Sequence, residues 1–455
     1  MRFTRPLTAA ASLVLAAAFL STPFNPRALA HPNHAPDGPA AAIEEARKDI
    51  EQWSAQAKAR PDDLMTLSRL GQSQLALARH TTDHADFAAA EQTFRRMLEV
   101  DASTSWAPYG LAYALVGQHR FKEALGFARD AALHEPDEAQ VTALIADVHL
   151  ALGNNAEALV MSERLAEQDL TLESLSRVAL ARHAMGRLDD ATHSMTEALE
   201  AGGMLDAEPR AIAWCRSMLG DFALDAADPE RAKAEWEGAL VLDPACHHAR
   251  WRLARLQLHR GDHADAVTEL RELVAQVPKP VYLATLADAL EADGDTEESG
   301  TVRARAEAAM KAELDADGLG HLREYAEFLL ARAAPGDAPR AVELALRDLN
   351  QVRQDPGAFD TAAWALFRAG NIKDAALMAD RAILRNPSHA PFMARAGVIS
   401  IAAGRRLEGR RLLASALQKE AALEPALAAE ARRVLESSPP PAPPVAAPSA
   451  PPPKP

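Results

Sequence analysis

A small residue recurs along this chain about every 34 residues, and no other feature of the sequence constrains the fold as strongly. The intervals between successive copies are 34, 34, 33, 41, 34, 33, 42, 34 and 34 residues. The ten copies are Ala90, Ala124, Ala158, Ala191, Ala232, Ala266, Ser299, Ala341, Ala375 and Gly409. Seven residues after each copy, two helical turns later, the side chain is apolar in every case but Asp348. An internal period of this length predicts an array of similar units.

Each unit is predicted to be a pair of helices joined by a glycine turn. A second helical pattern lies about eighteen to twenty residues before most copies, as in Leu219-Gly220 and Leu286-Ala287. The turn glycines are Gly153, Gly186, Gly261, Gly294, Gly370 and Gly404, and prolines twelve residues after a copy are Pro136, Pro244, Pro278 and Pro387. Proline ends a helix because it lacks the amide donor. A lone hairpin cannot bury its apolar face, so the units are expected to stack.

This pattern resembles the tetratricopeptide repeat, whose signature is Trp-x2-Leu-Gly-x2-Tyr followed by Ala-x3-Phe and Pro. Trp106, Tyr109, Gly110 and Tyr113 match the first part closely. The resemblance implies an all-α fold, a right-handed superhelical solenoid of about ten helix-turn-helix hairpins. The two long intervals are expected to hold loops, at Gly202-Gly203 and around Pro335 to Pro339.

The ends of the chain differ in composition from the array. Residues Met1 to Ala30 combine Arg2 and Arg5 with an apolar run and a terminal Ala-Leu-Ala, the parts of a secretory signal peptide. The last nineteen residues contain ten prolines, which predicts a disordered tail. The expected organisation is a signal peptide (1–30), a flexible leader (31–40), an N-terminal capping helix (41–60), the array (61–421), a C-terminal capping helix (422–436) and the tail (437–455).

The signal predicts a periplasmic or secreted protein, cleaved near Ala30, although a signal kept as an anchor stays open. We expect no stable membrane insertion of the mature chain. Lys and Arg total 49 against 64 Asp and Glu, a formal charge of −15, which makes a nucleic-acid partner improbable. The sequence lacks the nucleophile-elbow, zinc-protease, phosphate-loop and dinucleotide motifs, so we expect no enzyme activity and no cofactor.

The resemblance implies that the first helix of each repeat lines a concave groove that binds a protein or peptide. The groove residues expected in this way are Trp214, Asp221, His248, Trp251, Arg255, Asp288, Glu291, Trp364 and Phe367. At least two of the three tryptophans are expected to be exposed there. The acidic chain would attract basic partners. The predicted function is therefore an exported, noncatalytic scaffold for protein interactions, in envelope assembly or secretion.

Alternatives of another class stay open: a periplasmic receptor for a glycan or a metal, or a noncatalytic subunit of an envelope enzyme. Fifteen histidines suggest metal binding, but His259 and His263 flank a turn, and His80 and His84 lie in an insert without a cysteine nearby. No metal site is therefore expected. Cys215 and Cys246 are expected to be free thiols, because a regular array would hold them too far apart for a disulfide.

Overall fold

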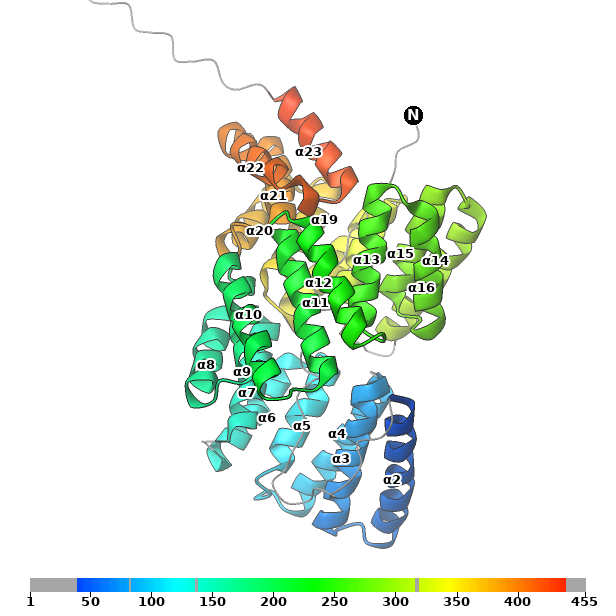
Figure 1. Ribbon diagram of the computed structural model, residues 1–455, viewed down its shortest axis with the longest axis vertical. Helices are drawn as coiled ribbons and strands as arrows, with labels where there is room; N and C mark the ends of the chain where they lie inside the picture. The colour runs from blue at the N-terminus through cyan, green and yellow to red at the C-terminus, as the bar shows by residue number, and fades with distance from the viewer. Residues whose placement is uncertain (1–38, 82, 136–137, 316–318, 439–455) are drawn as a thin grey trace, which may run out of the picture.

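The computed structural model describes residues 39–81, 83–135, 138–315 and 319–438 (Figure 1). Every element in these ranges is helical, and none is a strand. The all-α prediction is confirmed. The predicted signal peptide, most of the leader and nearly all of the proline-rich tail lie outside the described residues.

Ten helical hairpins follow one another, as the repeat pattern predicts. The first five are α3 (Leu64–Thr81) with α4 (His84–Val100), α5 (Ala107–Gly117) with α6 (Phe121–His134), α7 (Ala139–Leu152) with α8 (Asn155–Gln168), α9 (Leu172–Ala184) with α10 (Leu188–Met204), and α11 (Pro209–Asp225) with α12 (Pro229–Leu242). The second five are α13 (His247–Arg260) with α14 (His263–Gln276), α15 (Pro280–Asp293) with α16 (Thr296–Asp315), α17 (Leu322–Arg332) with α18 (Asp337–Arg347), α19 (Pro356–Arg368) with α20 (Ile372–Arg385), and α21 (Ala390–Ala402) with α22 (Arg406–Gln418).

One further helix lies at each end of this array. Helix α2 (Pro39–Ala59) packs against α3, and α23 (Pro425–Ser437) packs against α21 and α22. In Figure 1 the hairpins wind from α3 and α4 at the bottom of the view to α22 and α23 at the top. A 3-10 turn, η2 (Glu420–Ala422), joins α22 to α23.

The recurring small residues are buried where the two helices of each hairpin approach each other. All ten positions of the series are buried, and so are the ten positions seven residues later. The residues on the first helices that face large side chains of the second helices must also be small. Within two hairpins, a Cβ atom added at Gly71 would lie 2.8 Å from Cζ of Phe94, and one at Gly220 would lie 2.4 Å from Nε1 of the buried Trp236. Large side chains on the second helix therefore fill the space that a glycine on the first helix leaves.

Two departures from the period have a different structure from the loops expected. Gly202 and Gly203 lie in the last turn of α10, because the 41-residue interval lengthens α10 and α11 to 17 residues each. A Cβ atom at Gly202 would lie 2.5 Å from Leu172, so this glycine permits close helix packing. In the next long interval α16 extends to 20 residues. Of the segment expected as a loop there, only its first two residues precede α18.

Asp348, the polar exception in the apolar series, is buried in a π-helical turn, η1 (Asp348–Val352). Nε of Arg353 donates to its Oδ1 atom at 3.1 Å. Because of the extra residue of the π turn, α18 ends differently from the second helices of the other repeats. The buried ion pair takes the place of the apolar contact that the corresponding residue makes in those repeats.

The superhelix closes on itself across its axis, which corrects the expectation of a broad, open-ended groove. Three hydrogen bonds join early repeats to late ones: Gln354 N to Leu152 O (3.0 Å), Lys122 Nζ to Asn350 O (2.6 Å) and Ser388 Oγ to Gly186 O (2.9 Å). First helices that are distant in the sequence therefore face one another around a confined centre.

The buried small residue of a hairpin can be tested by enlarging it. Ala266→Leu should lower the free energy of unfolding by about 1–3 kcal/mol, because a larger side chain overpacks a site that is 0% exposed. Ala264→Leu, two residues earlier on the same helix at an exposed position, is the matched control and should be nearly neutral. Urea unfolding followed by circular dichroism measures both. Equal stability of the two variants would contradict the role given to the small-residue series.

Candidate functional site

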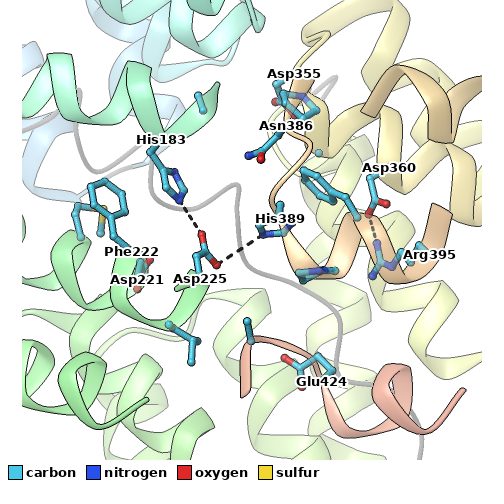
Figure 2. A pocket seen from close by; sticks show the side chains of 18 of the residues that line it. His183, Asp221, Phe222, Asp225, Asp355, Asp360, Asn386, His389, Arg395 and Glu424 are labelled. Atoms are coloured by element: carbon cyan, nitrogen blue, oxygen red, sulfur yellow. Dashed lines mark hydrogen bonds and ion pairs between the residues drawn. The ribbon is translucent and has the colours of Figure 1, made fainter. Parts of the chain in front are cut away.

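A cavity of about 240 Å³ lies at the centre of the closed superhelix (Figure 2). Its walls come mainly from the first helices α9, α11 and α13 on one side and α17, α19 and α21 on the other, and the η2–α23 segment closes one end. First helices line it because the second helix of each hairpin packs on the outside. The cavity is therefore a product of closure and is not a feature of any single repeat.

Arginine–carboxylate pairs connect successive first helices around this cavity. Arg252 Nε donates to Asp221 Oδ1 at 2.7 Å, Arg323 Nη1 to Asp355 Oδ1 at 2.8 Å, and Arg395 Nη1 to Asp360 Oδ2 at 2.5 Å. In each pair the partners are about one repeat apart in sequence. Burial would raise the pKa of the Asp221 carboxyl, but Arg252 and His248 hold it far below its usual range. The walls thus carry paired charges.

A second polar group crosses the centre and joins repeats four, five and ten. His183 Nε2 lies 2.7 Å from Asp225 Oδ2, and His389 Nε2 lies 3.8 Å from Asp225 Oδ1 (Figure 2). Burial would raise the pKa of Asp225, but the hydrogen bond from His183 and the nearby His389 lower it. Burial lowers the pKa of His389 to about 4, so this imidazole is neutral at pH 7.

The C-terminal segment is fastened to the cavity by Glu424, the residue before α23. Its carboxylate accepts a hydrogen bond from Arg255 and lies 2.7 Å from Nε2 of His259, both on α13. Burial would raise the pKa of Glu424, but His259 and Arg255 lower it to about 2. These contacts join residues 165 and 169 positions apart, so they hold the last helix against the middle of the array.

Five residues that line the cavity each have a side-chain atom that is inaccessible to solvent and has no hydrogen-bond partner in the described part of the chain. These atoms are Nε of Arg323, Nε of Arg395, Nδ1 of His389, Oδ1 of Asn155 and Oδ2 of Asp355. A buried polar atom without a partner costs free energy, and a bound ligand or water removes that cost. Because the residues that line the cavity include both donors and acceptors, the wall complements a dipolar group better than a simple ion.

Two of the nine groove residues expected from the sequence line the cavity: Asp221 and Arg255. His248 supports the first of them, since its Nε2 lies 2.9 Å from Oδ2 of Asp221. Asp288 and Glu291 lie away from the cavity and both pair with Arg303, at 2.7 and 2.9 Å.

The expectation that at least two of the three tryptophans are exposed is wrong. Trp251 is 1% exposed, and its Nε1 donates to Thr285 Oγ1 at 2.9 Å. Trp364 is 4% exposed and stacks on the half-buried Phe367, with ring centroids 5.2 Å apart. Trp214 is half-buried. The rings pack between repeats because a flat aromatic side chain fills the space between two first helices, while the arginines beside it reach the cavity.

The polar residues of the cavity that were not among the expected groove residues are Asn155, His183, Asp225, Arg252, His259, Arg323, Glu327, Asp355, Asp360, Asn386, His389, Arg395 and Glu424. Most of them lie on first helices, so the rule that first helices form the inner surface could have found them. Their convergence could not be found in this way, because it depends on contacts between repeats about 200 residues apart.

The two cysteines are free, as expected. Cys215 is fully buried on α11, and Cys246 is half-buried just before α13. Burial raises the pKa of both thiols, so neither has the lowered pKa of a reactive cysteine.

Comparison with known proteins agrees with the repeat pattern. Two family models of the tetratricopeptide repeat match residues 82–148 and 217–279 and support that family. No curated protein matches the sequence significantly. Within the described ranges, no helix has the length and apolarity needed to cross a membrane.

Several solved structures are similar to this chain at low sequence identity. YrrB, described as a TPR protein with an unusual peptide-binding site, is 17% identical, with 44% of this chain and 96% of that chain covered and a TM-score of 0.31. TTC0263, a TPR protein of Thermus thermophilus, is 20% identical, with coverages of 42% and 97% and a TM-score of 0.36. Yeast Tom70 is 12% identical, with coverages of 87% and 96% and a TM-score of 0.38.

The attachment of the C-terminal segment can be tested at Glu424. Glu424→Gln should lower the free energy of unfolding by about 3 kcal/mol, because it leaves the buried Arg255 without its carboxylate. Since the pKa of Glu424 is lowered to about 2, the stabilisation is fully present above its ordinary pKa and is lost as the pH falls towards 2. Thermal unfolding at pH 7 and at pH 3 measures this difference, which should shrink at pH 3.

The matched control is Glu420→Gln, four residues earlier. Glu420 pairs with Arg432 at the surface, where both side chains are 47% exposed. Surface pairs contribute little, so this variant should change stability by less than about 0.5 kcal/mol. Equal effects of the two substitutions would contradict the role of Glu424 in attaching the C-terminal segment.

Proposed function

We propose that this chain is a noncatalytic protein-interaction scaffold that binds a polypeptide segment in its central cavity. Tetratricopeptide repeats support a scaffold of this kind, and an array of such repeats is generally noncatalytic. The observation that carries the proposal is the central cavity of about 240 Å³, whose lining residues include both hydrogen-bond donors and acceptors.

The chemistry of the wall favours a peptide as the ligand. A peptide group offers one N–H donor and one C=O acceptor, which matches a wall that presents both kinds of atom. In each Arg–carboxylate pair the two charges neutralise each other, so the wall does not select for a strongly charged small molecule. At about 240 Å³ the cavity is smaller than the usual range for drug-sized ligands, and it suits one anchoring side chain with its backbone.

The charge of the chain favours a basic partner. With a formal charge of −15, the long-range field attracts cationic segments and repels acidic ones. The glycan receptor is supported less well, because Trp251 and Trp364 are buried and cannot stack on a sugar.

The proposed location is the periplasm or the exterior, with a role in envelope assembly or secretion. The support is the pattern of the first 30 residues alone: two arginines, an apolar run and a terminal Ala-Leu-Ala. If this pattern is a cleaved signal, protein purified from the cells that naturally produce it should begin at His31. N-terminal sequencing by mass spectrometry measures this, and a chain that keeps Met1 to Ala30 would contradict it.

Peptide binding can be tested with a displayed library of random peptides and the purified protein. The library should yield binders enriched in basic residues, and their affinity should fall at least about tenfold in Ala421→Trp. Ala421 is an exposed residue on the cavity rim, so a large ring there blocks the entrance without breaking an ion pair. Loss of one anchoring contact of about 1.4 kcal/mol corresponds to this factor.

Ala403→Trp is the control for added aromatic surface, because Ala403 is exposed just after α21 and does not line the cavity. Fluorescence anisotropy with the selected peptides measures both affinities. Binders that lose affinity equally in both variants, or in neither, would place the binding surface elsewhere.

A further inference from the structure

We propose that His84, His119 and His321 form a binding site for a divalent transition-metal ion, with Zn²⁺ as the reference ion. Each histidine offers one ring nitrogen, and these three atoms all lie within 4.8 Å of one another. The site lies outside the central cavity and does not depend on peptide binding. It also corrects the pairing of His80 with His84 considered from the sequence, since the ring that approaches His84 is that of His119, at 5.6 Å between centroids.

Two of the three histidines lie in neighbouring repeats, and closure of the superhelix brings the third to them. His84 begins α4, His119 lies in the turn between α5 and α6, and His321 precedes α17. The ring of His119 is in contact with both others, since its centroid lies 5.9 Å from that of His321. His119 and His321 are 202 positions apart, so a bound ion would connect repeats one and two with repeat eight.

The backbone at His119 is in a conformation that L-residues rarely adopt. Its φ is 58°, and the corresponding turns of other repeats place a glycine there, such as Gly153 at 83° and Gly261 at 88°. A histidine in the left-handed region costs free energy that glycine avoids. The conformation places the imidazole between two distant segments, which a glycine at this position could not provide.

The segment that carries His321 can approach His119 closely because the residue before His321 is a glycine. A Cβ atom at Gly320 would lie 2.5 Å from Cδ2 of His119. The carbonyl oxygen of Gly320 accepts a hydrogen bond from Nη2 of Arg353 at 3.1 Å, which fixes this segment against the connection between η1 and α19. The geometry of the cluster is therefore supported on both sides.

The imidazole of His119 has a ring nitrogen that is available to bind a metal ion. Nδ1 of His119 is buried and has no hydrogen-bond partner among the residues that the structure describes. Neutral imidazole is a preferred ligand of zinc, copper and nickel.

The ligand distances suit a small ion after a modest side-chain movement. Three nitrogens at about 2.0–2.1 Å from a tetrahedral zinc lie roughly 3.3 Å apart. The present separations therefore need to close by at most about 1.5 Å, which rotation of half-buried rings supplies. Three protein ligands leave one coordination position for water or for a donor from a partner.

Zinc titration of tag-free full-length protein tests the site, with a chromophoric chelator as competitor. One zinc per chain is expected, and His119→Asn and His321→Gln should each weaken it by at least about 100-fold, since loss of even an outer partner of a metal ligand costs 10–100-fold. Asparagine is chosen because it tolerates the left-handed backbone at position 119. Cobalt should give visible absorption bands that disappear in the same variants.

His134→Gln is the matched control, because His134 is exposed at the end of α6, the helix that follows His119. It should bind zinc as the original chain does. Zinc should also raise the melting temperature and slow amide exchange at residues 118–120 and 319–322 in the original chain only. Far-UV circular dichroism confirms that each variant is folded. Absence of tight binding in the original chain, or binding that survives both substitutions, would overturn the site.

Discussion

The close approach of two helices at one small residue per hairpin is the contact on which the whole structure depends. At Gly71 and Gly220 even a methyl group would overlap a buried aromatic ring, so the helix separation is set by the absence of a side chain. This spacing lets large rings fill the hairpin from the second helix and leaves the first helices to face the axis. Since a solenoid is stabilised by neighbour contacts, repetition of one local rule is enough to build the array.

Closure of the superhelix adds polar contacts that the repeated spacing of small residues does not supply. Buried ion pairs such as Asp221–Arg252 and Asp360–Arg395 join neighbouring first helices, while Asp225 and Glu424 join distant ones. Removing charges from water offsets much of their attraction, so such pairs add little net stability. Each pair nevertheless penalises any arrangement that leaves one partner alone. We therefore attribute the register of facing repeats to these charges and the cohesion of each hairpin to its apolar contacts.

The hairpins could be predicted from the sequence because their signal is local: small residues at a fixed spacing, glycine in the turns and proline after the second helices. The candidate site was predicted only in part. Asp221 and Arg255 lie on a surface that the repeat pattern defines, whereas Trp251 shows that an aromatic residue on a first helix can also pack between repeats. The meeting of His119 with His321 depends on the 202-position separation between them, and no local pattern records the curvature that brings them together.

The contacts across the axis are separable from the contacts within hairpins, and this separation bears on how a ligand enters. The bond from Ser388 to Gly186 can break without disturbing a hairpin, because neither residue lies in the apolar interior of one. Opening the centre therefore breaks the polar contacts across the axis and the apolar contacts that join repeats one to three to the later repeats in one buried cluster, but it leaves the contacts within each hairpin intact. A ring that opens in this way can admit a polypeptide chain, and an ion held by His84, His119 and His321 would oppose the opening because it would join repeats one and two to repeat eight.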